Sequence, residues 1–487
     1  MPARIRAYEP VLRRSFLLVV VYATAAVIAL LLARRMTDPD IGWHLRVGEW
    51  TVAHRAVPDE ELFSSHSVPG PWVAYSWAYD VLLYGLRTVF GLHAQLVLAV
   101  TLSLLIAHTL FDLVRRISGR TPLAAAMTGV GIIAMAPMLY GRSTMFTILF
   151  ALLEIHLLVR AGVLGQRRAL LLVPLVFVAW ANVHVQFLFG FFVYACFLAQ
   201  AGYDARAKSP DPRPLAERRQ LVAWMSAVGA ASLAATLVNP YGIRIYDPLL
   251  RYLGQAPTIY QSLRELQPPS FSLISTWMAL GIALVVLVWA ARRMLGRPFL
   301  LALFAVAAFV GFRSERDEWF IVAAGATVVA IAAGRPREPE ESPAHPLAVG
   351  LGTASVVALA AWSLDLSTAS LSANLRRHFP VGAAEFIEAE RLPGPMYNHY
   401  NWGGYLMWRL PDWKVSIDGR SYVHATEYFE HTLQVWKAAP GWEDDPDLSR
   451  AGFVVGQRGM PLTAMLADDP RFRIAYEDEV SAVYVRR

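Results

Sequence analysis

Residues 36–72 hold the densest group of side chains that could carry out chemistry. Two carboxylates, Asp38 and Asp40, are followed by the imidazole of His44 and then by the guanidinium of Arg46. Carboxylates and an imidazole can bind a divalent cation or act as a general base, and an arginine beside them can hold a phosphate group. An acidic surface turn would have the same composition, so a catalytic site and a structural turn are both open readings of this segment.

Tryptophan is frequent in and beside the same segment, at Trp43, Trp50, Trp72 and Trp77. Indole rings suit the interface between a membrane and water, and they also suit the face of a sugar. Trp43 is next to His44 in the sequence, so we take it as a candidate substrate-binding residue.

A second candidate group lies near the ends of other apolar runs. Asn182 and His184 interrupt an apolar stretch, where polar groups are costly unless they are paired or line a cavity. They could face the same cavity as the first loop, or they could form hydrogen bonds between helices. Arg142 and Arg316 could each hold a lipid phosphate or simply extend toward the membrane surface.

The stretch 416–420 follows a strand that the pattern of 413–417 predicts. Ligands of α/β proteins bind beyond the ends of strands, but a glycine-bearing turn with an internal ion pair between Asp418 and Arg420 is the favoured reading. The chain contains no Walker loop, Rossmann glycine fingerprint, nucleophile elbow or zincin motif. ATP-driven transport by this chain alone and zincin-type proteolysis therefore have no support.

The elements that must position these residues are membrane helices. Hydrophobic residues make up 56% of the 487-residue chain and charged residues only 17%, against roughly 25% in soluble domains. These values argue against one soluble globule and against a disordered chain, and they predict a polytopic membrane protein. The basic residues lie in short loops, so we expect no nucleic-acid partner. The only cysteine, Cys196, lies in an apolar run, which excludes an intrachain disulfide and a Cys-based metal cluster.

Eleven apolar runs are predicted to cross the membrane. The segment 73–91 carries Asp80 and Arg87 and is predicted to be an interfacial helix. With a cytoplasmic N-terminus, this arrangement places most loop arginines and lysines on the cytoplasmic face, as the positive-inside rule requires. The predicted spans are 16–33, 94–113, 122–140, 143–159, 169–183, 186–203, 221–239, 274–291, 298–312, 319–334 and 346–364.

Two domains are predicted. Residues 1–369 form an all-α polytopic membrane bundle with about 11 transmembrane helices, which includes the first external loop, 36–72, and the interfacial helix 73–91. Residues 370–487 contain no run of membrane length and are predicted to form a small C-terminal extracytoplasmic α/β domain. Its predicted helices are 381–391 and 426–437, and its predicted strands are 413–417, 453–455, 472–476 and 480–485.

This order of features resembles the GT-C glycosyltransferases, a class that includes oligosaccharyltransferase catalytic subunits, protein mannosyltransferases and aminoarabinose transferases. A basic first span, an external loop with Asp-x-Asp, many further spans and a C-terminal external domain carry the resemblance. The chain also resembles a group of bacterial polytopic membrane proteins within or near this class. The shared motifs lie at 38–45 with 48–50, 180–184, 239–242, and 403–405 through 417–420.

The resemblance implies transfer of a sugar from a polyprenyl-phosphate carrier to a glycan, lipid or protein acceptor. The reaction would take place at the external face of the bacterial cytoplasmic membrane. Asp38 or Asp40 would be the base or would bind a divalent metal, Mg²⁺ or Mn²⁺, with His44 as a further catalytic residue. Trp43 and His44 match no feature of the characterised enzymes. The substrate-binding residues would be Trp43, Arg46, Arg142, Asn182, His184 and Arg316.

Two other functions fit the same composition. A transporter or flippase of a lipid-linked glycan would need a polar path through the bilayer, for which Glu154, His156, His108 and Asp112 are candidates. A non-catalytic scaffold would bind cell-envelope partners through residues 370–487. The GT-C-like glycosyltransferase is the leading hypothesis.

Overall fold

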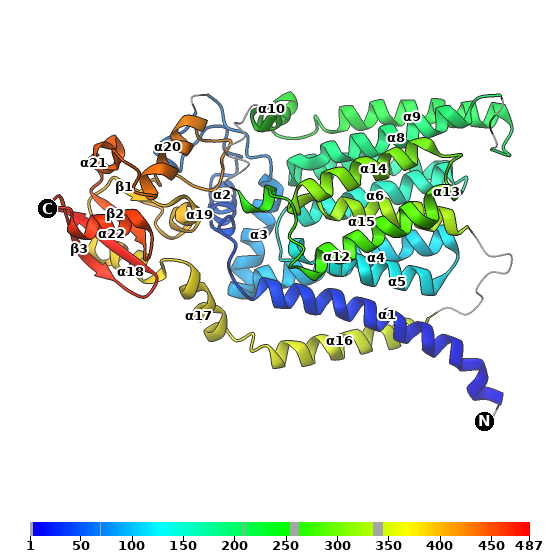
Figure 1. The fold of residues 1–487 in the computed structure, drawn as a ribbon, viewed down its shortest axis with the longest axis horizontal. Helices are drawn as coiled ribbons and strands as arrows, with labels where there is room; N and C mark the ends of the chain where they lie inside the picture. Colours follow the sequence, from blue (N-terminus) through cyan, green and yellow to red (C-terminus); the bar gives the residue numbers. More distant parts are fainter. Residues whose placement is uncertain (1–2, 69, 208, 210, 254–262, 335–343) are drawn as a thin grey trace. The chain divides into compact units, whose positions relative to one another are not determined.

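The computed structural model forms two compact units, each assembled from segments that are distant in the sequence (Figure 1). Unit 1 comprises Met1–Ala33, Gln95–Gly242 and Leu263–Asp365, and unit 2 comprises Arg34–Ala94, Ile243–Ser262 and Leu366–Arg487. The first loop and the C-terminal segment thus belong to the same unit. The sequence-based boundary between residues 369 and 370 stays a prediction. The described residues are 3–68, 70–207, 209, 211–253, 263–334 and 344–487.

Unit 1 is a helical bundle whose longer helices are connected by short helical turns. Helical structure is found at each of the eleven predicted apolar runs. Its elements are α1 (Ala3–Ala33), α4 (Ala94–Ser118), α5 (Thr121–Ala134), η2 (Ala136–Met138), α6 (Thr144–Gly162), η3 (Arg167–Leu172), α7 (Val173–Val183), η4 (Val185–Phe187), α8 (Leu188–Asp204), α9 (Leu215–Ala235), η6 (Arg264–Leu266), α12 (Ile274–Val285), the π-helical turn η7 (Val286–Ala290), α13 (Ala291–Arg293), α14 (Pro298–Arg313), η8 (Glu315–Asp317), α15 (Trp319–Ala333) and α16 (Pro346–Ser363).

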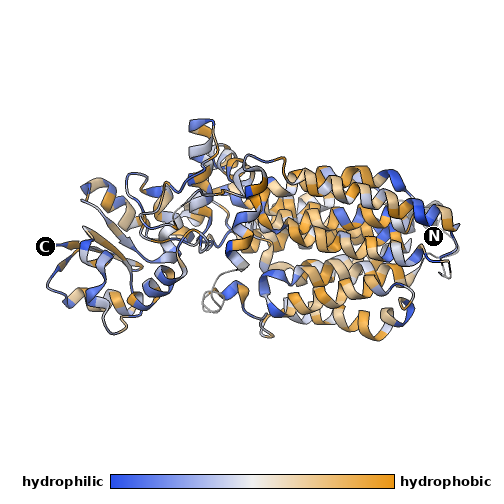
Figure 2. Cartoon of the chain, turned by 90° about the horizontal axis from the view of Figure 1, so that it is seen from above, coloured by the Kyte–Doolittle hydropathy of each residue, from blue (hydrophilic) through white to orange (hydrophobic). Residues whose placement is uncertain are grey.

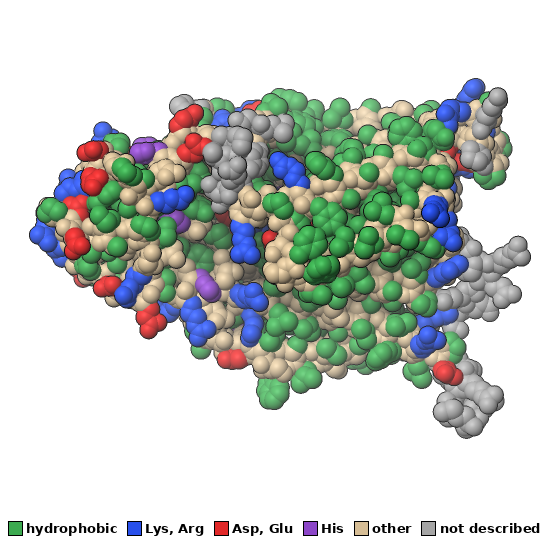
Figure 3. All heavy atoms as spheres, in the orientation of Figure 1, with side chains coloured by type: hydrophobic (Ala, Val, Ile, Leu, Met, Phe, Trp, Pro, Cys, Tyr) green, Lys and Arg blue, Asp and Glu red, His purple; other side chains and the backbone are tan. Residues whose placement is uncertain are grey.

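The composition of these helices is that of membrane spans. Figure 2 shows them as predominantly hydrophobic, and in Figure 3 hydrophobic side chains cover much of the visible flank of the bundle. The chain is a multi-pass membrane protein, and the predicted number of about eleven spans stays a prediction. Within the described residues, six helical stretches are long and apolar enough to cross a membrane: Glu9–Ala33, Trp77–Ser118, Thr144–Gly162, Val185–Asp204, Ile274–Arg293 and Pro346–Ser363.

Helix α15 forms the centre of unit 1. All its residues from Trp319 to Ala330 are buried, which explains why this helix is apolar on every side. It packs against α5, α6, α12 and α14. Helix α1 packs instead along α16, which is largely exposed.

Unit 2 combines two helices from the first third of the chain with a small α/β assembly. Its elements are α2 (Ile41–His54), α3 (Trp77–Phe90), η1 (Gly91–His93), η5 (Gly242–Tyr246), α10 (Asp247–Leu253), α17 (Thr368–His378), α18 (Val381–Glu390), β1 (Met396–Asn398), α19 (Tyr400–Arg409), α20 (Thr426–Trp436), η9 (Trp442–Asp444), α21 (Pro446–Arg450), β2 (Phe453–Gln457), α22 (Pro461–Asp468), β3 (Phe472–Glu477) and β4 (Ser481–Arg486).

The four strands form one sheet in the order β1-β2-β4-β3. Strand β1 is parallel to β2, and the β2–β4 and β3–β4 pairs are antiparallel. Apolar side chains of the strands pack with Trp436 of α20 and Leu462 of α22 into one core. The predicted helices at 381–391 and 426–437 are confirmed, as are the predicted strands at 453–455, 472–476 and 480–485.

The predicted strand at 413–417 is wrong. Val415 makes only an isolated bridge to Ser64 of the first loop. The next residue, Ser416, donates its amide to the side-chain oxygen of Asn398 at 2.8 Å. A side chain therefore takes the place of a backbone partner, and the pairing ends after one residue.

Close backbone contacts join α2 to its neighbours. A Cβ atom placed on Gly48 of α2 would lie 2.1 Å from the carbonyl oxygen of Asp80 in α3. A Cβ on Gly42 would lie 2.2 Å from the carbonyl oxygen of Gly404 in α19. Only glycine permits these approaches, because any side chain there would force the helices apart.

We predict that Gly48→Ala destabilises the protein by about 1–3 kcal/mol, because the added methyl group meets backbone that cannot rotate away. The control is Gly85→Ala in α3, where an added Cβ has no atom within 4 Å. That change should be neutral or stabilise by up to about 1 kcal/mol, since alanine is the better helix former. Thermal unfolding of the full chain in detergent tests the pair, and equal melting temperatures would contradict the packing argument.

Candidate functional site

The Asp-Pro-Asp stretch forms a tight turn at the start of α2. The amide of Asp40 donates to Oδ1 of Asp38 at 3.1 Å, and the amide of His44 donates to the carbonyl oxygen of Asp40 at 3.2 Å. Asp38 is 7% exposed and Asp40 is half-buried. One oxygen of Asp38 is thus engaged by the backbone of its own turn, as is usual for an aspartate that begins a helix.

Glycines from the C-terminal segment lie directly against this turn. A Cβ on Gly419 would be 2.4 Å from Oδ1 of Asp40, and one on Gly404 would be 2.5 Å from the carbonyl oxygen of Pro39. The carboxylate of Asp40 therefore lies against the backbone of Gly419, which is about 380 positions further along the chain. The C-terminal segment shapes the surroundings of Asp40.

His44 is held by a buried carboxylate on the neighbouring helix. Its Nδ1 lies 2.5 Å from Oδ1 of Asp80, and the Ser76 hydroxyl donates to the same oxygen at 3.1 Å. The indole of Trp43 stacks on the imidazole at 3.5 Å, and Tyr79 approaches it edge-on at 4.7 Å. An ionised carboxylate can only accept, so Nδ1 carries the proton in that state and the ring orientation is set.

Arg46 is paired within its own helix. Its guanidinium donates to Glu49 at 2.9 Å and lies 5.7 Å from the ring centre of Phe63. Asp38, Asp40, Trp43, His44 and Arg46 are thus all in unit 2, at the first turns of α2.

A buried charge network, which we call the Arg420 clamp, joins the first loop to the C-terminal segment. Arg420 donates to Glu61 at 2.8 and 3.1 Å and to Asp418 at 2.9 and 2.8 Å. The Ser64 hydroxyl donates to Asp418 at 2.9 Å, and the indole of Trp72 lies 4.9 Å from the guanidinium. The predicted ion pair between Asp418 and Arg420 is confirmed.

Electrostatics within the clamp favour full ionisation. Burial opposes the charge on Asp418, but Arg420 outweighs it and holds the pKa of that carboxyl well below its usual range. Burial also opposes the charge on Arg420, and Asp418 with Glu61 keeps the pKa of the guanidinium well above its usual value. Each charge is therefore stable only because the other is present.

Backbone hydrogen bonds extend the clamp along the loop. The amide of Ser65 donates to Val415 at 2.8 Å, and the amide of Val68 donates to Val423 at 2.8 Å. The indole of Trp72 donates to the hydroxyl of Tyr422 at 3.2 Å. The first loop is thus fixed along its length to residues 415–423.

In unit 1, the predicted arginines share one carboxylate, which we call the arginine–Glu265 cluster. Arg142 donates to Glu265 at 2.6 Å, and Arg316 approaches the other oxygen of Glu265 at 3.4 Å. Burial opposes the charge on Glu265, but Arg142 and Arg316 hold its pKa below the ordinary value. Glu265 is accordingly ionised at neutral pH.

His184 belongs to the same corner of unit 1, whereas Asn182 serves another purpose. His184 is buried and contacts the Thr147 hydroxyl at 2.9 Å. Burial, followed by the charges of Arg316 and Arg142, lowers its pKa well below the usual value, so the ring is neutral. Asn182 donates to the carbonyl oxygen of Val178 in its own helix and to that of Val238 in the turn after α9, each at 2.8 Å. A cavity shared with the first loop stays a prediction.

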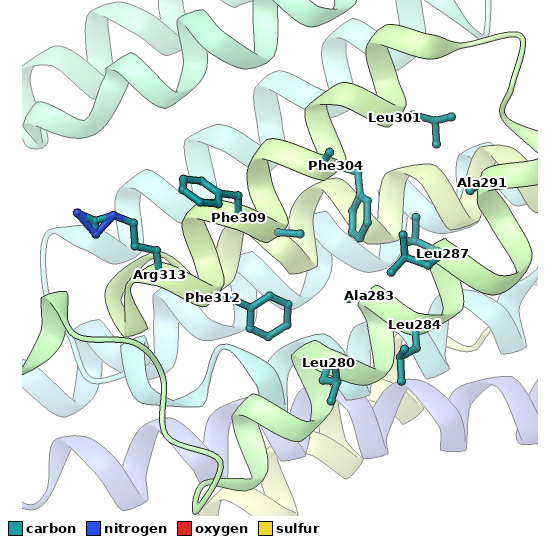
Figure 4. A pocket seen from close by; sticks show the side chains of 13 residues that line it. Leu280, Ala283, Leu284, Leu287, Ala291, Leu301, Phe304, Phe309, Phe312 and Arg313 are labelled. Atoms are coloured by element: carbon teal, nitrogen blue, oxygen red, sulfur yellow. The ribbon is translucent and has the colours of Figure 1, made fainter.

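An apolar groove of about 660 Å³ lies between α12 with its π turn and α14 (Figure 4). Leu284 and Leu287 line one side, and Phe304 and Phe309 line the other. Arg313 lies at the end of the groove opposite Ala291 in the close-up, and it is the one charged residue among the described lining residues. Arg313 lies three positions before Arg316, which is in the turn η8.

The described side chains show which residues could bind a divalent metal ion. Among the described residues no group of three or more His, Cys, Asp or Glu could hold an ion. Asp38 and Asp40 together supply the one or two carboxylates with which Mg²⁺ is usually bound when water and substrate phosphate complete its coordination. The donor set therefore fits a metal shared with substrate and not a closed protein cage.

Sequence reasoning missed Asp80, Glu61 and Glu265 as partners of the candidate residues. A partner for Asp80 could have been predicted from the sequence, because a carboxylate inside an apolar helix requires one. Glu61 and Glu265 lie in polar segments where a single acidic residue carries no such signal.

Comparison with known proteins identifies the fold. No protein-family model and no curated protein matches the chain. The archaeal oligosaccharyltransferase AglB from Archaeoglobus fulgidus, in complex with an inhibitory peptide and a dolichol-phosphate, gives a TM-score of 0.56. Its sequence is 10% identical, and the match covers 92% of this chain and 70% of that chain. The apo form of the Archaeoglobus fulgidus oligosaccharyltransferase gives a TM-score of 0.52 at 10% sequence identity. The match covers 91% of this chain and 69% of that chain.

A third structure, the arabinofuranosyltransferase AftD from Mycobacteria, gives a TM-score of 0.48 at 16% identity over 96% of this chain and 40% of that chain. A score below 0.5 does not establish a shared fold. The chain shares its fold with these two oligosaccharyltransferase structures, in agreement with the resemblance of its sequence to the GT-C class.

We predict that Arg420→Met destabilises the protein by about 3–5 kcal/mol, because Asp418 and Glu61 would be left buried without a counter-charge. The control is Arg409→Met, whose pair with Glu388 at 3.4 Å is largely exposed and should contribute about 0–1 kcal/mol. Thermal unfolding in detergent compares the two variants. An equal, small loss in both would show that the clamp does not stabilise the loop.

Proposed function

We propose that the chain is a GT-C-type glycosyltransferase that moves a sugar from a polyprenyl-phosphate carrier to a glycan, lipid or protein acceptor. The observation that carries the proposal is the oligosaccharyltransferase-like fold together with the Asp-Pro-Asp turn at the start of α2. The protein would act in the bacterial cytoplasmic membrane, with a cytoplasmic N-terminus and with residues 370–487 on the extracytoplasmic side.

Asp40 is the proposed base. Asp38 is only 7% exposed and Asp40 is partly exposed, so Asp40 is the more accessible of the two carboxylates. Asp40 would take the proton of the acceptor hydroxyl while the acceptor oxygen bonds to the anomeric carbon. The bond from that carbon to the carrier phosphate would break, and the phosphate would leave with its electron pair.

His44 and Trp43 would complete the site. The Asp80 carboxylate fixes the imidazole, so His44 could act without first reorienting. Trp43, stacked on that ring, offers an aromatic face of the kind on which sugars pack. Arg46 would contribute positive charge close by.

Asp38 and Asp40 would hold a Mg²⁺ or Mn²⁺ ion if the reaction uses one. Bound there, the ion would offset negative charge on the leaving phosphate. The chain's own contribution would be the two carboxylates and the fixed turn that carries them.

Arg142 and Arg316 are the proposed phosphate ligands, with His184 beside them as a neutral hydrogen-bonding group. The groove between α12 and α14 supports a lipid substrate, since its lining is apolar and its charged end, Arg313, precedes Arg316 by three positions. The hydrocarbon chain of the carrier would lie in this groove.

We expect Asp40→Asn to slow transfer by about 10²–10⁴-fold while carrier binding is retained, because the amide cannot accept the proton. Native mass spectrometry of protein purified in detergent should show a polyprenyl phosphate in the wild type. The sugar-bearing form should accumulate in Asp40→Asn. The exposed carboxylate of the same loop, in Asp59→Asn, is the control and should resemble the wild type. Absence of any polyprenyl phosphate from all three proteins would remove the proposal's main support.

A further prediction concerns Gly419→Ala. The added methyl group would meet Oδ1 of Asp40 and displace it, so transfer should fall at least about tenfold with carrier binding unchanged. The accumulated sugar-bearing carrier measures this effect, with Gly85→Ala as the matched glycine control. Normal turnover in Gly419→Ala would show that the position of Asp40 does not matter for the reaction.

A further inference from the structure

Three of the points at which the chain passes between the two units adjoin apolar helices. The chain enters unit 2 at Arg34, after α1, returns to unit 1 at Gln95, in the first turn of α4, and enters unit 2 again at Leu366, after α16. Stretches of α1, α4 and α16 are long and apolar enough to cross a membrane. Residues that adjoin the end of a span lie at the boundary between membrane and water, so these points mark the part of unit 2 that is nearest the membrane.

The three points are joined to one another within unit 2. The side-chain amide of Asn374 in α17 donates to the carbonyl oxygen of Arg34 at 3.0 Å. The ring Nε2 of His93 in η1 lies 2.7 Å from the carbonyl oxygen of Leu366, and η1 packs on α17. We call the surface that these segments form the junction surface, and its residues are 34–35, 89–93 and 366–378.

Two arginines of the junction surface are exposed and have no ion pair among the described residues. Arg35 directly follows Arg34 in the chain. Arg377 makes one contact, at 3.5 Å, with Oδ1 of Asn374, the same side chain that holds the carbonyl group of Arg34. Arg35 and Arg377 therefore extend from the same edge of unit 2. The neighbouring Arg376 differs, because its guanidinium is paired with a carboxylate of α18 at 2.6 Å.

Exposed apolar side chains adjoin these arginines. Val89 and Phe90, in the last turn of α3, are 73% and 44% exposed. Helices α3 and α4 belong to one long apolar stretch, Trp77–Ser118, but α4 alone has 25 residues and is about 38 Å long. That length is enough to cross a hydrocarbon core of about 30 Å, so α3 is free to lie in the interface. Exposed apolar groups beside arginines are typical of a surface that lies on a bilayer.

We propose that the junction surface is a docking site for the anionic phospholipid head groups of the bilayer. Arg35 and Arg377 hold the phosphate groups, and Val89 and Phe90 enter the apolar region beneath them. An anionic head group has no ammonium to offset its phosphate, so a net attraction to the two arginines remains. The inference goes beyond the proposed glycosyl transfer and does not depend on it. Since Arg35 lies three positions before Asp38, the docked lipid adjoins the start of the Asp-Pro-Asp turn.

Photochemical crosslinking of the full chain in phosphatidylcholine nanodiscs tests the inference. The nanodiscs contain a small fraction of phosphatidylglycerol with a diazirine near the top of one acyl chain, or the matching phosphatidylcholine probe. Peptide mass spectrometry should find the phosphatidylglycerol probe on the junction surface at about five times the level of the phosphatidylcholine probe. Titration of the probe fraction should show an apparent affinity about thirtyfold lower in the double variant Arg35→Gln/Arg377→Gln.

The matched control is Arg450→Gln/Arg473→Gln. These arginines, in α21 and β3, are likewise exposed and without an ion pair among the described residues, but they lie outside the junction surface. The control should label like the wild type. The pair Arg35→Lys/Arg377→Lys keeps both charges and should also label like the wild type. Where the glutamine pair lowers the melting temperature, the lysine pair decides: wild-type labelling supports the charged site, and loss of labelling contradicts it.

Several results would overturn the inference. Equal labelling by the two probes would reduce the junction surface to a general bilayer contact, and no labelling would remove it from the membrane. Unchanged labelling in Arg35→Gln/Arg377→Gln, or an equal loss in the control pair, would exclude the two arginines as the binding groups. Displacement of the probe by decaprenyl phosphate but not by unlabelled phosphatidylglycerol would assign the surface to the lipid carrier.

Discussion

A guanidinium with no exposed surface requires matching charges within hydrogen-bond distance, and Arg420 finds them in Asp418 and Glu61. Asp418 is two positions away, but Glu61 lies in the first loop. The charge of Arg420 can be accommodated only when the loop and the C-terminal segment are together. The same association aligns the loop with the C-terminal segment, because Ser65 and Val68 donate their amides to Val415 and Val423.

The Asp-Pro-Asp turn depends on the same association. Gly404 and Gly419 lie against Pro39 and Asp40 with no room for a side chain. Residues far along the chain thus define the shape of the space beside the proposed base. A catalytic residue on a loop is well positioned when a second segment packs against it, and the C-terminal segment packs against Asp40 in this way.

Unit 1 shows a different use of charge. Its helices are packed by apolar side chains, with α15 buried along most of its length. The arginine–Glu265 cluster is polar and partly exposed. The apolar groove with Arg313 at one end lies on the same unit. A hydrocarbon groove and a set of arginines suit the two chemically different parts of a lipid phosphate.

The sequence by itself determined the membrane class, the positions of the apolar helices, and several elements of the C-terminal segment such as α18, α20 and β2. It could do so because composition and periodicity are local properties, read within one segment. The Asp418–Arg420 pair was predictable for the same reason, since the two residues are neighbours. The strand expected at 413–417 did not form. Its alternating pattern is a property of the segment itself, but a strand also needs a partner from elsewhere in the chain, and Val415 makes only an isolated bridge to Ser64.

Only the tertiary structure decided which distant groups meet. It paired His44 with Asp80, Arg420 with Glu61, and both Arg142 and Arg316 with Glu265. It also turned Asn182 toward the backbone carbonyl groups of Val178 and Val238, whereas His184, two positions further on, lies near the arginines. Such contacts depend on how whole elements pack, and a charged residue in a polar segment has many possible partners until the fold selects one.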